Sequence, residues 1–396
     1  MSLDTDTSKL TNTTNTANIT DSSNISDNTP IWAPSRRVDL PRLDRDIDAD
    51  VCVVGLGGSG LACVRALLDR GARVVGVDAV DVAAGAAGRN GGFLLGGLAM
   101  FHHDAATRLG RTEARAIYEA TLDQIRRMTG ETPSAVRATG SLRIATSEEE
   151  LEDCALQFEA MHADGLPVER YRGPEGCGLL FPADAVFDPA KRCDALADDA
   201  LRRGARLFAQ SPVLAIDDGC AVTEHGRVRA RHIVVAVDGR LEVLLPELST
   251  RVTSARLQML ATAPLSELRY SRPIYARWGL DYWQQLADGR LALGGCRDVG
   301  GEAEWTTDAQ PSEPVQSALT TLLRNGLHVD APITHRWAAT VGYTQSGMPI
   351  LECVRPGVWA MGAYSGTGNV IGALCGRAVA DVVLTGQSAL ADLLRA

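Results

Sequence analysis

The sequence predicts an α/β fold, and three features of residues 50–79 carry that prediction. Residues 50–54 (DVCVV) are an apolar run typical of a buried strand, and residues 72–79 (ARVVGVDA) are a second such run. Between them, residues 61–71 (LACVRALLDRG) have the pattern of a helix that ends at a glycine. The turn from the first strand into this helix reads GLGGSG, which matches G-x-G-x-x-G. Together these features predict a βαβ unit.

The turn has the glycines that a dinucleotide site requires. Gly55 permits the tight turn, Gly57 lets a pyrophosphate approach the backbone, and Gly60 lets the helix pack closely on the strand. The positive end of the helix then faces the phosphates, while Asp78 is placed to accept hydrogen bonds from ribose hydroxyls. The candidate cofactor-binding residues here are Gly55, Gly57, Gly58, Ser59, Gly60 and Asp78. A structural turn in an unrelated α/β protein is the competing interpretation, and the unit alone leaves the choice of dinucleotide open.

Composition and charge exclude several classes of function. The chain has 396 residues with 39 basic and 49 acidic side chains, so no basic surplus is present to bind nucleic acid or an anionic membrane. Nine cysteines without a C-x-x-C pair indicate neither a disulfide framework nor a zinc site, and no metal is expected. Because no long apolar run occurs, no membrane span is predicted.

The rest of the chain predicts two interleaved domains. Residues 1–30 are rich in Ser, Thr, Asn and Asp and fit no targeting segment, so we expect a disordered tail over residues 1–45 and a cytoplasmic protein. Further helices are predicted over residues 104–130, 147–164, 193–203, 311–326 and 370–384. A chain that leaves the nucleotide-binding domain and returns to it explains this order. We assign residues 46–100, 185–245 and 335–396 to the nucleotide-binding domain, and residues 101–184 and 246–334 to a substrate domain.

Five segments give the chain a family resemblance. They are VCVVGLGGSGLACVRALLDRGARVVGVDA, GAAGRNGG, AVFDPAKRCDALADDALRRGARLFAQSPV, HIVVAVDG, and WAATVGYTQSGMPI with MGAYSGTGNVIGALCGRAVADVVLTG. In this order they resemble the FAD-dependent amine and amino-acid oxidases, which include D-amino acid oxidase, glycine oxidase and sarcosine oxidase. The gamma-glutamylputrescine oxidase branch is the most similar. The resemblance covers residues 48–390 and implies a glutathione-reductase-like FAD domain interleaved with an α+β substrate domain on an antiparallel sheet.

The resemblance also implies which residues lie along FAD. Val213 would meet the adenine through its backbone, and Gly239 would lie near the pyrophosphate or the ribityl chain. Two turns would reach the flavin ring, Arg89-Asn90-Gly91 and Gly366-Thr367-Gly368-Asn369. The N-terminus of the last helix would stabilise the negative charge of reduced flavin. A helix cap at Asn369 and a solvated loop arginine at Arg89 are the competing interpretations.

Several positions depart from the family pattern. Asp78 stands where Glu is usual, Ala87 where Ser is common, and Ser346 where many members have Asp. Some members hold FAD through a cysteine, but Val341 and Gly342 lie where it would fall, so noncovalent FAD is expected. The lysine that helps oxygen react in sarcosine-oxidase-like members is also missing from the matching region. Oxygen or another electron acceptor therefore remains open.

The substrate site is predicted less sharply. Residues Tyr282, Trp283, Gln284 and Gln285 lie on a strand, so either Tyr282 with Gln284 or Trp283 with Gln285 faces the pocket. Arg277 and Arg297 are candidate anchors for a carboxylate, with a surface arginine as the competing interpretation of each. With Tyr282 they are the candidate catalytic residues. His102 and His103 follow an apolar segment and could reach the pocket, although a loop role is the simpler interpretation.

The expected reaction is oxidation of a C–N bond in a small amine or amino acid. Hydride passes to flavin N5 from the carbon next to a neutral nitrogen, and the imine product is hydrolysed by water. No acid–base triad is needed, because positioning and electrostatics suffice. The alternatives are an FAD-dependent dehydrogenase of an amine or hydroxy acid with another electron acceptor, an NAD-dependent reductase, and a flavin-bearing protein without turnover.

Overall fold

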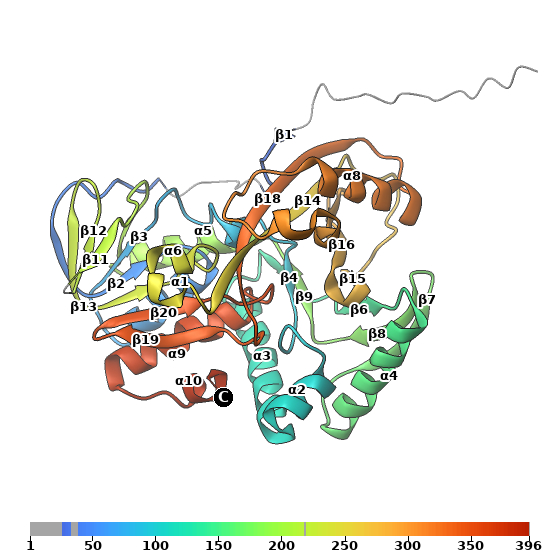
Figure 1. The fold of residues 1–396 in the computed structure, drawn as a ribbon, viewed down its shortest axis with the longest axis horizontal. Coiled ribbons are helices and arrows are strands. Elements are labelled where there is room, and N and C mark those ends of the chain that lie inside the picture. Colours follow the sequence, from blue (N-terminus) through green and yellow to red (C-terminus); the bar gives the residue numbers. More distant parts are fainter. Residues whose placement is uncertain (1–25, 33–38, 218, 396) are drawn as a thin grey trace, which may run out of the picture.

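Two halves, each built on a large sheet, are joined by long strands in the computed structural model (Figure 1). The half on the left of the figure contains the first βαβ unit, and the half on the right is a long twisted sheet flanked by helices. The structure describes residues 26–32, 39–217 and 219–395. Across these residues, no helix is both long and apolar enough to cross a membrane.

The first sheet has eight strands and contains the predicted unit. Strand β2 (Ile47–Val54) leads through helix α1 (Gly58–Leu68) to strand β3 (Val74–Val77), which pairs with β2 in parallel. The spatial order is β10 (Arg206–Phe208), β3, β2, β13 (Arg227–Val235), β12 (Cys220–Val222) and β11 (Ala215–Asp217), with β20 (Val358–Gly362) beside β13 and β19 (Ile350–Arg355) beside β20. All pairs from β10 through β13 to β20 are parallel, so this core must be covered on both faces.

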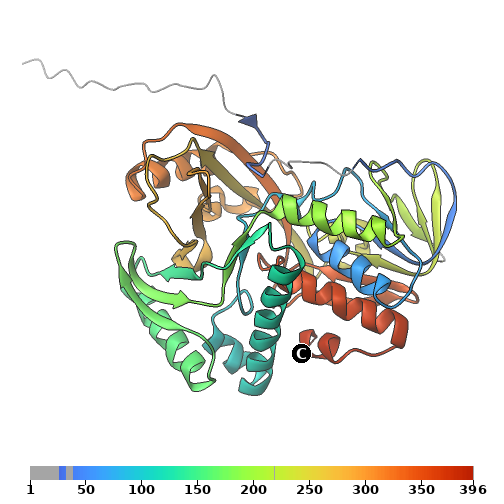
Figure 2. The same ribbon diagram turned by 180° about the vertical axis from the view of Figure 1, so that it is seen from behind.

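Three helices lie side by side on one face of this sheet (Figure 2). Helix α1 packs against both α5 (Pro189–Arg202) and α9 (Ile371–Thr385). Their buried side chains form one hydrophobic cluster with those of β2 and β3. A second cluster, which includes Leu241 and Leu245, covers the opposite face.

The second sheet has nine strands and is mostly antiparallel. Its spatial order is β1 (Ser26–Asp27), β18 (Ile333–Thr344), β14 (Val252–Thr262), β17 (Leu291–Gly294), β16 (Asp281–Gln285), β15 (Ile274–Ala276), β6 (Ser141–Ile144), β8 (Gly176–Phe181) and β7 (Glu169–Gly173). Only the β1–β18 and β15–β6 pairs are parallel within the described part of this sheet. Helix α8 (Glu313–Thr321) packs on it through Val315 and Leu319. The predicted fold class is confirmed.

The remaining elements connect the two sheets. The helix predicted over residues 104–130 is divided into α2 (His102–Leu109) and α3 (Arg111–Glu131), because Gly110 adopts φ +93° between them. The other elements are α4 (Glu148–Ala163), α6 (Leu241–Leu244), α7 (Arg297–Gly300), α10 (Ala389–Leu394), a π-helical turn (Leu322–Gly326), 3-10 turns (Ala86–Gly88, Pro246–Leu248, Arg277–Gly279, Gly301–Glu304), and a small sheet of β4 (Phe93–Leu94), β9 (Ala185–Phe187) and β5 (Val136–Arg137).

Part of the predicted tail packs on the folded chain. Strand β1 pairs with β18, and the side chains of Ile31 and Trp32 are 4% and 5% exposed. Burial of these two large apolar side chains holds residues 26–32 on the folded chain. The polar composition of residues 1–30 as a whole does not indicate this contact. Residues 1–25 and 33–38 lie outside the described residues.

The predicted domain boundaries remain a prediction, but one strand bears on them. Residues 335–344 were assigned to the nucleotide-binding domain, whereas β18 is a strand of the second sheet that pairs with β14 along its length. The segment after β18 then enters the first sheet as β19 and β20. The chain therefore passes from the second sheet to the first near residue 345, about ten residues later than the predicted boundary at residue 335.

The contact between α1 and α9 depends on a glycine. A Cβ atom on Gly376 would lie 2.5 Å from the Ser59 carbonyl oxygen and 2.8 Å from the Cys63 nitrogen, both backbone atoms. We expect Gly376→Ala to destabilise the protein by about 1–3 kcal/mol, because the two helices must separate. Thermal or urea unfolding measures this change.

Gly130 in α3 provides the matched control, because a Cβ there would meet nothing within 4 Å. Gly130→Ala should be neutral or stabilising by up to about 1 kcal/mol, through helix propensity alone. Equal effects of the two substitutions would contradict the packing argument.

Candidate functional site

The turn after β2 presents bare backbone at the start of α1. Gly55 adopts φ +102°, and a Cβ atom on Gly60 would lie 1.9 Å from the Gly55 carbonyl oxygen. Gly57 is the N-cap of α1, and no side chain caps the helix, so its first N–H groups are free for a ligand. A Cβ on Gly58 would meet nothing within 4 Å, while Ser59 is buried. The turn therefore fits a pyrophosphate bound through backbone N–H groups.

Asp78 lies at the carboxyl end of β3, beside this turn. Its carboxylate accepts the backbone N–H of Leu56 at 2.8 Å and of Val80 at 2.9 Å. Burial raises the pKa of Asp78. The two backbone bonds fix the carboxylate at the edge where the parallel strands end, which is the position expected for a ribose-binding acid.

Two further predicted contacts lie in segments that follow strands of the first sheet. Val213 is partly buried between β10 and β11, and Gly239 follows β13 closely. A Cβ on Gly239 would lie 2.5 Å from the Thr340 carbonyl oxygen, so only glycine allows β18 to pass so closely. Asp238, which the sequence did not single out, accepts the backbone N–H of Tyr364 at 3.2 Å, and burial raises its pKa to about 6.

The loop that follows the 3-10 turn Ala86–Gly88 is held in shape by Asn90. Its side-chain amide donates to the carbonyl of Ala87 at 2.9 Å, and its Oδ1 accepts the backbone N–H of Gly92 at 2.8 Å. The carbonyl of Asn90 accepts the indole N–H of Trp32 at 2.7 Å. The loop is thus closed by its own side chain and covered by the segment that precedes β2.

Arg89 faces the protein instead of solvent. Its Nε donates to the carbonyl of Ala338 in β18 at 2.8 Å, and its Nη2 donates to the carbonyl of Asn28 at 2.7 Å. The carbonyl of Arg89 accepts the indole N–H of Trp337 at 2.8 Å. These contacts argue against a solvated loop arginine, while direct contact with the cofactor stays a prediction.

Asn369 joins the last turn to this loop. Its Nδ2 donates to Oδ1 of Asn90 at 3.1 Å and to the carbonyl of Phe93 at 2.9 Å. Helix α9 begins at Ile371 with Val370 as its N-cap, so Asn369 does not cap the helix and that competing interpretation is wrong. The structure therefore brings together the two predicted cofactor turns, Arg89-Asn90-Gly91 and Gly366-Thr367-Gly368-Asn369.

Strand β16 turns Tyr282 and Gln284 toward the same loop. A Cβ on Gly91 would lie 3.1 Å from the Tyr282 ring, and Gln284 donates its amide N–H to the Gly91 carbonyl. Trp283 instead packs in the hydrophobic cluster under α8, and Gln285 donates to the carbonyls of Glu267 and Gly289. The sequence left two pairs open. Of these, Tyr282 and Gln284 face the loop of residues 89–92, which we call the cofactor loop.

The two arginines predicted to hold a carboxylate already have partners in the protein. Arg277 donates to Asp281 at 2.7 Å and to Asp298 at 2.9 Å, and these carboxylates raise its pKa. Arg297 lies over the Trp305 ring, 4.6 Å from the ring centroid. The carboxylate-binding role of both residues stays a prediction.

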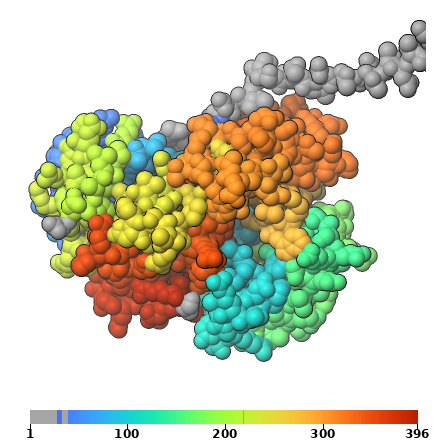
Figure 3. Space-filling view, in the orientation of Figure 1, coloured from blue at the N-terminus to red at the C-terminus, as the bar shows by residue number. Residues whose placement is uncertain are grey.

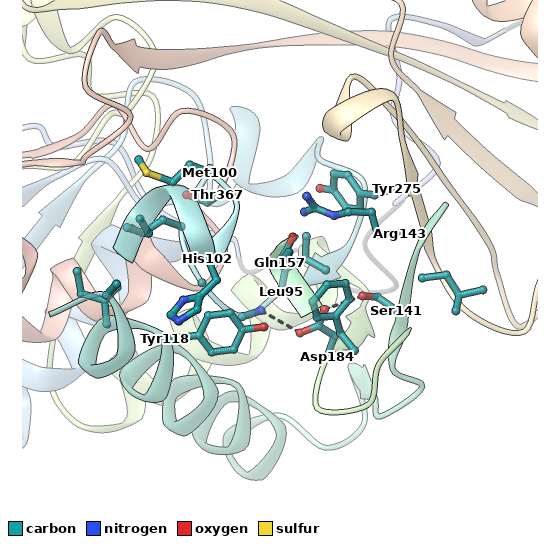
Figure 4. A pocket seen from close by; sticks show the side chains of 18 residues that line it. Leu95, Met100, His102, Tyr118, Ser141, Arg143, Gln157, Asp184, Tyr275 and Thr367 are labelled. Atoms are coloured by element: carbon teal, nitrogen blue, oxygen red, sulfur yellow. Dashed lines mark hydrogen bonds between the residues drawn. The ribbon is translucent and has the colours of Figure 1, made fainter. Parts of the chain in front are cut away.

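A pocket lies between the cofactor turns and the second sheet. Its wall includes Thr367, Met100, His102, Tyr118, Ser141, Arg143, Asp184 and Tyr275 (Figure 4). In the space-filling view the surface is hollowed between the cyan chain near residue 105 and the gold chain near residue 275 (Figure 3). The mixture of polar and apolar side chains in this wall suits a small polar ligand.

Only one of the two candidate histidines lines this pocket. His102 is 3% exposed and its Nε2 lies 2.7 Å from Oδ2 of Asp164, whereas His103 is not part of the wall. In the described chain, no three His, Cys, Asp or Glu side chains are grouped as a metal site would need.

Sequence reasoning missed Arg143, Asp184 and Tyr118, because three separate elements bring them together. One local signal was present. In the strand GSLRI, Ser141 and Arg143 alternate with apolar residues, so one face of this strand is polar, although β6 lies inside the second sheet.

The site has the features that a bound dinucleotide requires. They are the bare backbone at the start of α1, the acid after β3, and the two glycine-rich turns joined by Asn369. The residues present therefore fit FAD.

Comparison with known proteins finds relatives over most of the chain. A family model described as FAD dependent oxidoreductase (DAO) matches residues 50–382. The probable oxidoreductase OrdL of Rhizobium meliloti is 27% identical over 387 residues, covering 91% of this chain and 89% of that protein. The gamma-glutamylputrescine oxidoreductase of Escherichia coli is 27% identical over 377 residues, covering 86% and 85%. The solved structure of an L-amino acid deaminase from Proteus vulgaris has a TM-score of 0.73 at 18% identity, covering 90% of this chain and 96% of that one.

The Asn369 bridge gives a testable prediction for cofactor binding. Asn369→Asp removes both N–H donors and places a carboxylate against Oδ1 of Asn90 and the carbonyl of Phe93. We expect FAD to bind about 10- to 100-fold more weakly, because the loss of two partly buried hydrogen bonds and the repulsion of the new carboxylate would separate the two turns. Fluorescence of released FAD during dilution measures this affinity.

Asn325→Asp is the matched control, because Asn325 is exposed and far from both turns in the chain. It introduces the same charge and should leave the FAD affinity unchanged. Equal affinities of wild type and Asn369→Asp would remove the bridge from the description of the site.

Proposed function

Since this chain belongs to the DAO family of FAD-dependent oxidoreductases, we propose that it oxidises a C–N bond of a small amine or amino acid. The enzyme class and the use of FAD follow from the family. The substrate and the bond are the proposal, and the relative named gamma-glutamylputrescine oxidoreductase, similar over 86% of this chain, supports a nitrogen-containing substrate.

The chain's own residues divide the work between cofactor and substrate. The turn Gly55–Gly60, Asp78 and the two turns bridged by Asn369 would hold FAD without a covalent bond. When bound, FAD supplies the two-electron oxidation. The protein contributes binding, orientation and exclusion of water around the carbon that is oxidised.

The observation that carries the proposal is the pocket itself. It runs from Thr367, in the turn predicted to contact the flavin, to Tyr275 and Arg143 of the second sheet. Its aromatic side continues through Tyr275, Tyr282 and Phe93, whose ring centroids lie 5.3–5.9 Å apart. Such a wall excludes water and favours a substrate whose nitrogen has lost its proton, because a neutral amine is desolvated at lower cost than an ammonium ion.

Anaerobic titration tests this function. We expect one group of amines or amino acids to bleach the oxidised-flavin absorbance of the purified yellow protein, with a rate that rises with pH as the substrate nitrogen deprotonates. A panel should include hydroxy acids and polyols of matched size. Bleaching by these compounds alone would refute the oxidation of a C–N bond and leave the family assignment intact.

The electron acceptor is a separate question. A lysine near the flavin helps oxygen react in sarcosine-oxidase-like members, and no lysine of the described residues lines this pocket, which favours an acceptor other than oxygen. The sequence has two lysines, of which Lys191 lies in α5 with its Nζ donating to the Ser134 carbonyl at 2.8 Å, outside the pocket. Lys9 lies outside the described residues. The second candidate function is therefore a dehydrogenase that passes electrons to a quinone or a protein.

Stopped-flow mixing of the substrate-reduced enzyme with air-saturated buffer separates the two candidates. A dehydrogenase should reoxidise much more slowly than it turns over with an artificial quinone acceptor. Reoxidation by oxygen at the rate of turnover, with release of hydrogen peroxide, would identify an oxidase.

A further inference from the structure

One charged side chain of the pocket forms no ion pair with the other residues that the structure describes. Arg143 is in β6, and its side chain points into the pocket beside Tyr275 (Figure 4). Its Nε is buried without a hydrogen-bond partner, and no carboxylate of the described residues forms an ion pair with it. A buried guanidinium N–H without an acceptor is costly, so this side chain is suited to an anion that arrives with a ligand.

The surroundings of Arg143 fix its orientation but do not neutralise it. Its Cζ lies 4.1 Å from the centroid of the Phe101 ring, which supports one face of the planar group. Glu150 of α4 is the acid whose field reaches Arg143 from that helix. Its carboxylate is already taken, because it accepts the backbone N–H groups of Thr146 at 2.8 Å and Trp278 at 2.7 Å.

Asp184 is the second acid near Arg143, and it is also held elsewhere. Its Oδ1 accepts the backbone N–H of Gly96 at 2.9 Å, and its Oδ2 accepts the hydroxyl of Ser141 at 2.6 Å. Asp184 thus ties the loop after β4 to β6. These bonds leave the guanidinium of Arg143 facing the open pocket.

We propose that Arg143 binds a carboxylate of the substrate, so that the enzyme acts on amines that carry an acidic group away from the oxidised carbon. The inference rests on the proposed function for the identity of the substrate, but not for the existence of the anion site. Thr367 and Arg143 lie on opposite sides of the pocket in Figure 4, which leaves room for a chain between the nitrogen and the acid. Arg143 suits this role better than Arg277, whose guanidinium is paired with two carboxylates.

Ligand binding to the FAD-loaded protein tests the site without turnover. Butyrate and its neutral amide, butyramide, have matched shapes and are titrated while the flavin absorbance is followed. Wild type should bind butyrate more tightly than butyramide. Arg143→Gln should weaken butyrate binding about 10- to 100-fold and leave butyramide unchanged, as expected when a charge-assisted hydrogen bond is lost.

Two further variants keep the test decisive. Arg143→Lys retains the charge without the planar fork, so its preference for butyrate should be intermediate. Arg172→Gln removes the same charge from an exposed position in β7 of the same sheet and should behave as wild type. If all four proteins bind both ligands with one affinity ratio, Arg143 has only a structural role and the proposal is overturned.

The same proteins separate this inference from the proposed function. A pair such as 6-aminohexanoate and hexylamine is tested for anaerobic bleaching of the flavin. Bleaching by both with equal efficiency would retain amine oxidation and remove the acid-binding site. Arg143-dependent binding of butyrate without bleaching by any amine would retain the site and remove amine oxidation.

Asp184 gives the site a pH signature. Burial raises the pKa of Asp184 to about 7, and Arg143 of β6, Tyr118 of α3 and Tyr275 of β15 are the titratable or charged groups that face it. As the pH rises through 7, Asp184 becomes negative inside the pocket while butyrate stays ionised. Butyrate should therefore bind more weakly at pH 8.5 than at pH 5.5, and Asp184→Asn should abolish the difference. Wild-type affinity that is independent of pH would place the anion elsewhere.

Discussion

The site depends on one side-chain amide. Asn369 donates to Oδ1 of Asn90 and to the carbonyl of Phe93, and the partners are 279 and 276 positions away in the sequence. Without this bridge, the turn before α9 and the loop after α1 and β3 would be two unrelated surface loops. With it, they form a single surface that faces Tyr282 of the second sheet. Trp32 and Gln284 hold the same loop through its backbone carbonyls.

Close backbone approach is the second constraint, and glycines carry it. Helix α1 touches the turn that precedes it at Gly60 and touches α9 at Gly376, so it is held between β2 and the last helix. The N-terminus of α1 therefore has a fixed place relative to α9, whose own N-terminus follows Asn369. The same close packing that stabilises the core sets the distance between the two helix ends that a dinucleotide would span.

The sequence predicts the features that depend on local pattern. The βαβ unit, Asp78 and the glycine-rich turns were found because each is a short run with a strong conformational requirement. Arg143, Asp184 and Trp32 were not, because their roles arise from neighbours contributed by distant elements. The orientation of Tyr282 is not predicted, because alternation along a strand separates two faces but does not show which of them points toward the cofactor loop. The ion pairs of Arg277 with Asp281 and Asp298 could not be predicted either, because they depend on how the turn folds.

The cofactor loop is contacted from both ends of the chain. Trp32 covers Asn90 from a segment that precedes β2, and Asn369 reaches the same residue from the turn before α9. During synthesis, the first sheet can begin to form early, but it lacks β20 until residue 362 has been made. The loop is completed later still, because Asn369 is made after the residues of β20. The nascent chain therefore exposes a half-built cofactor site until Asn369 has been made.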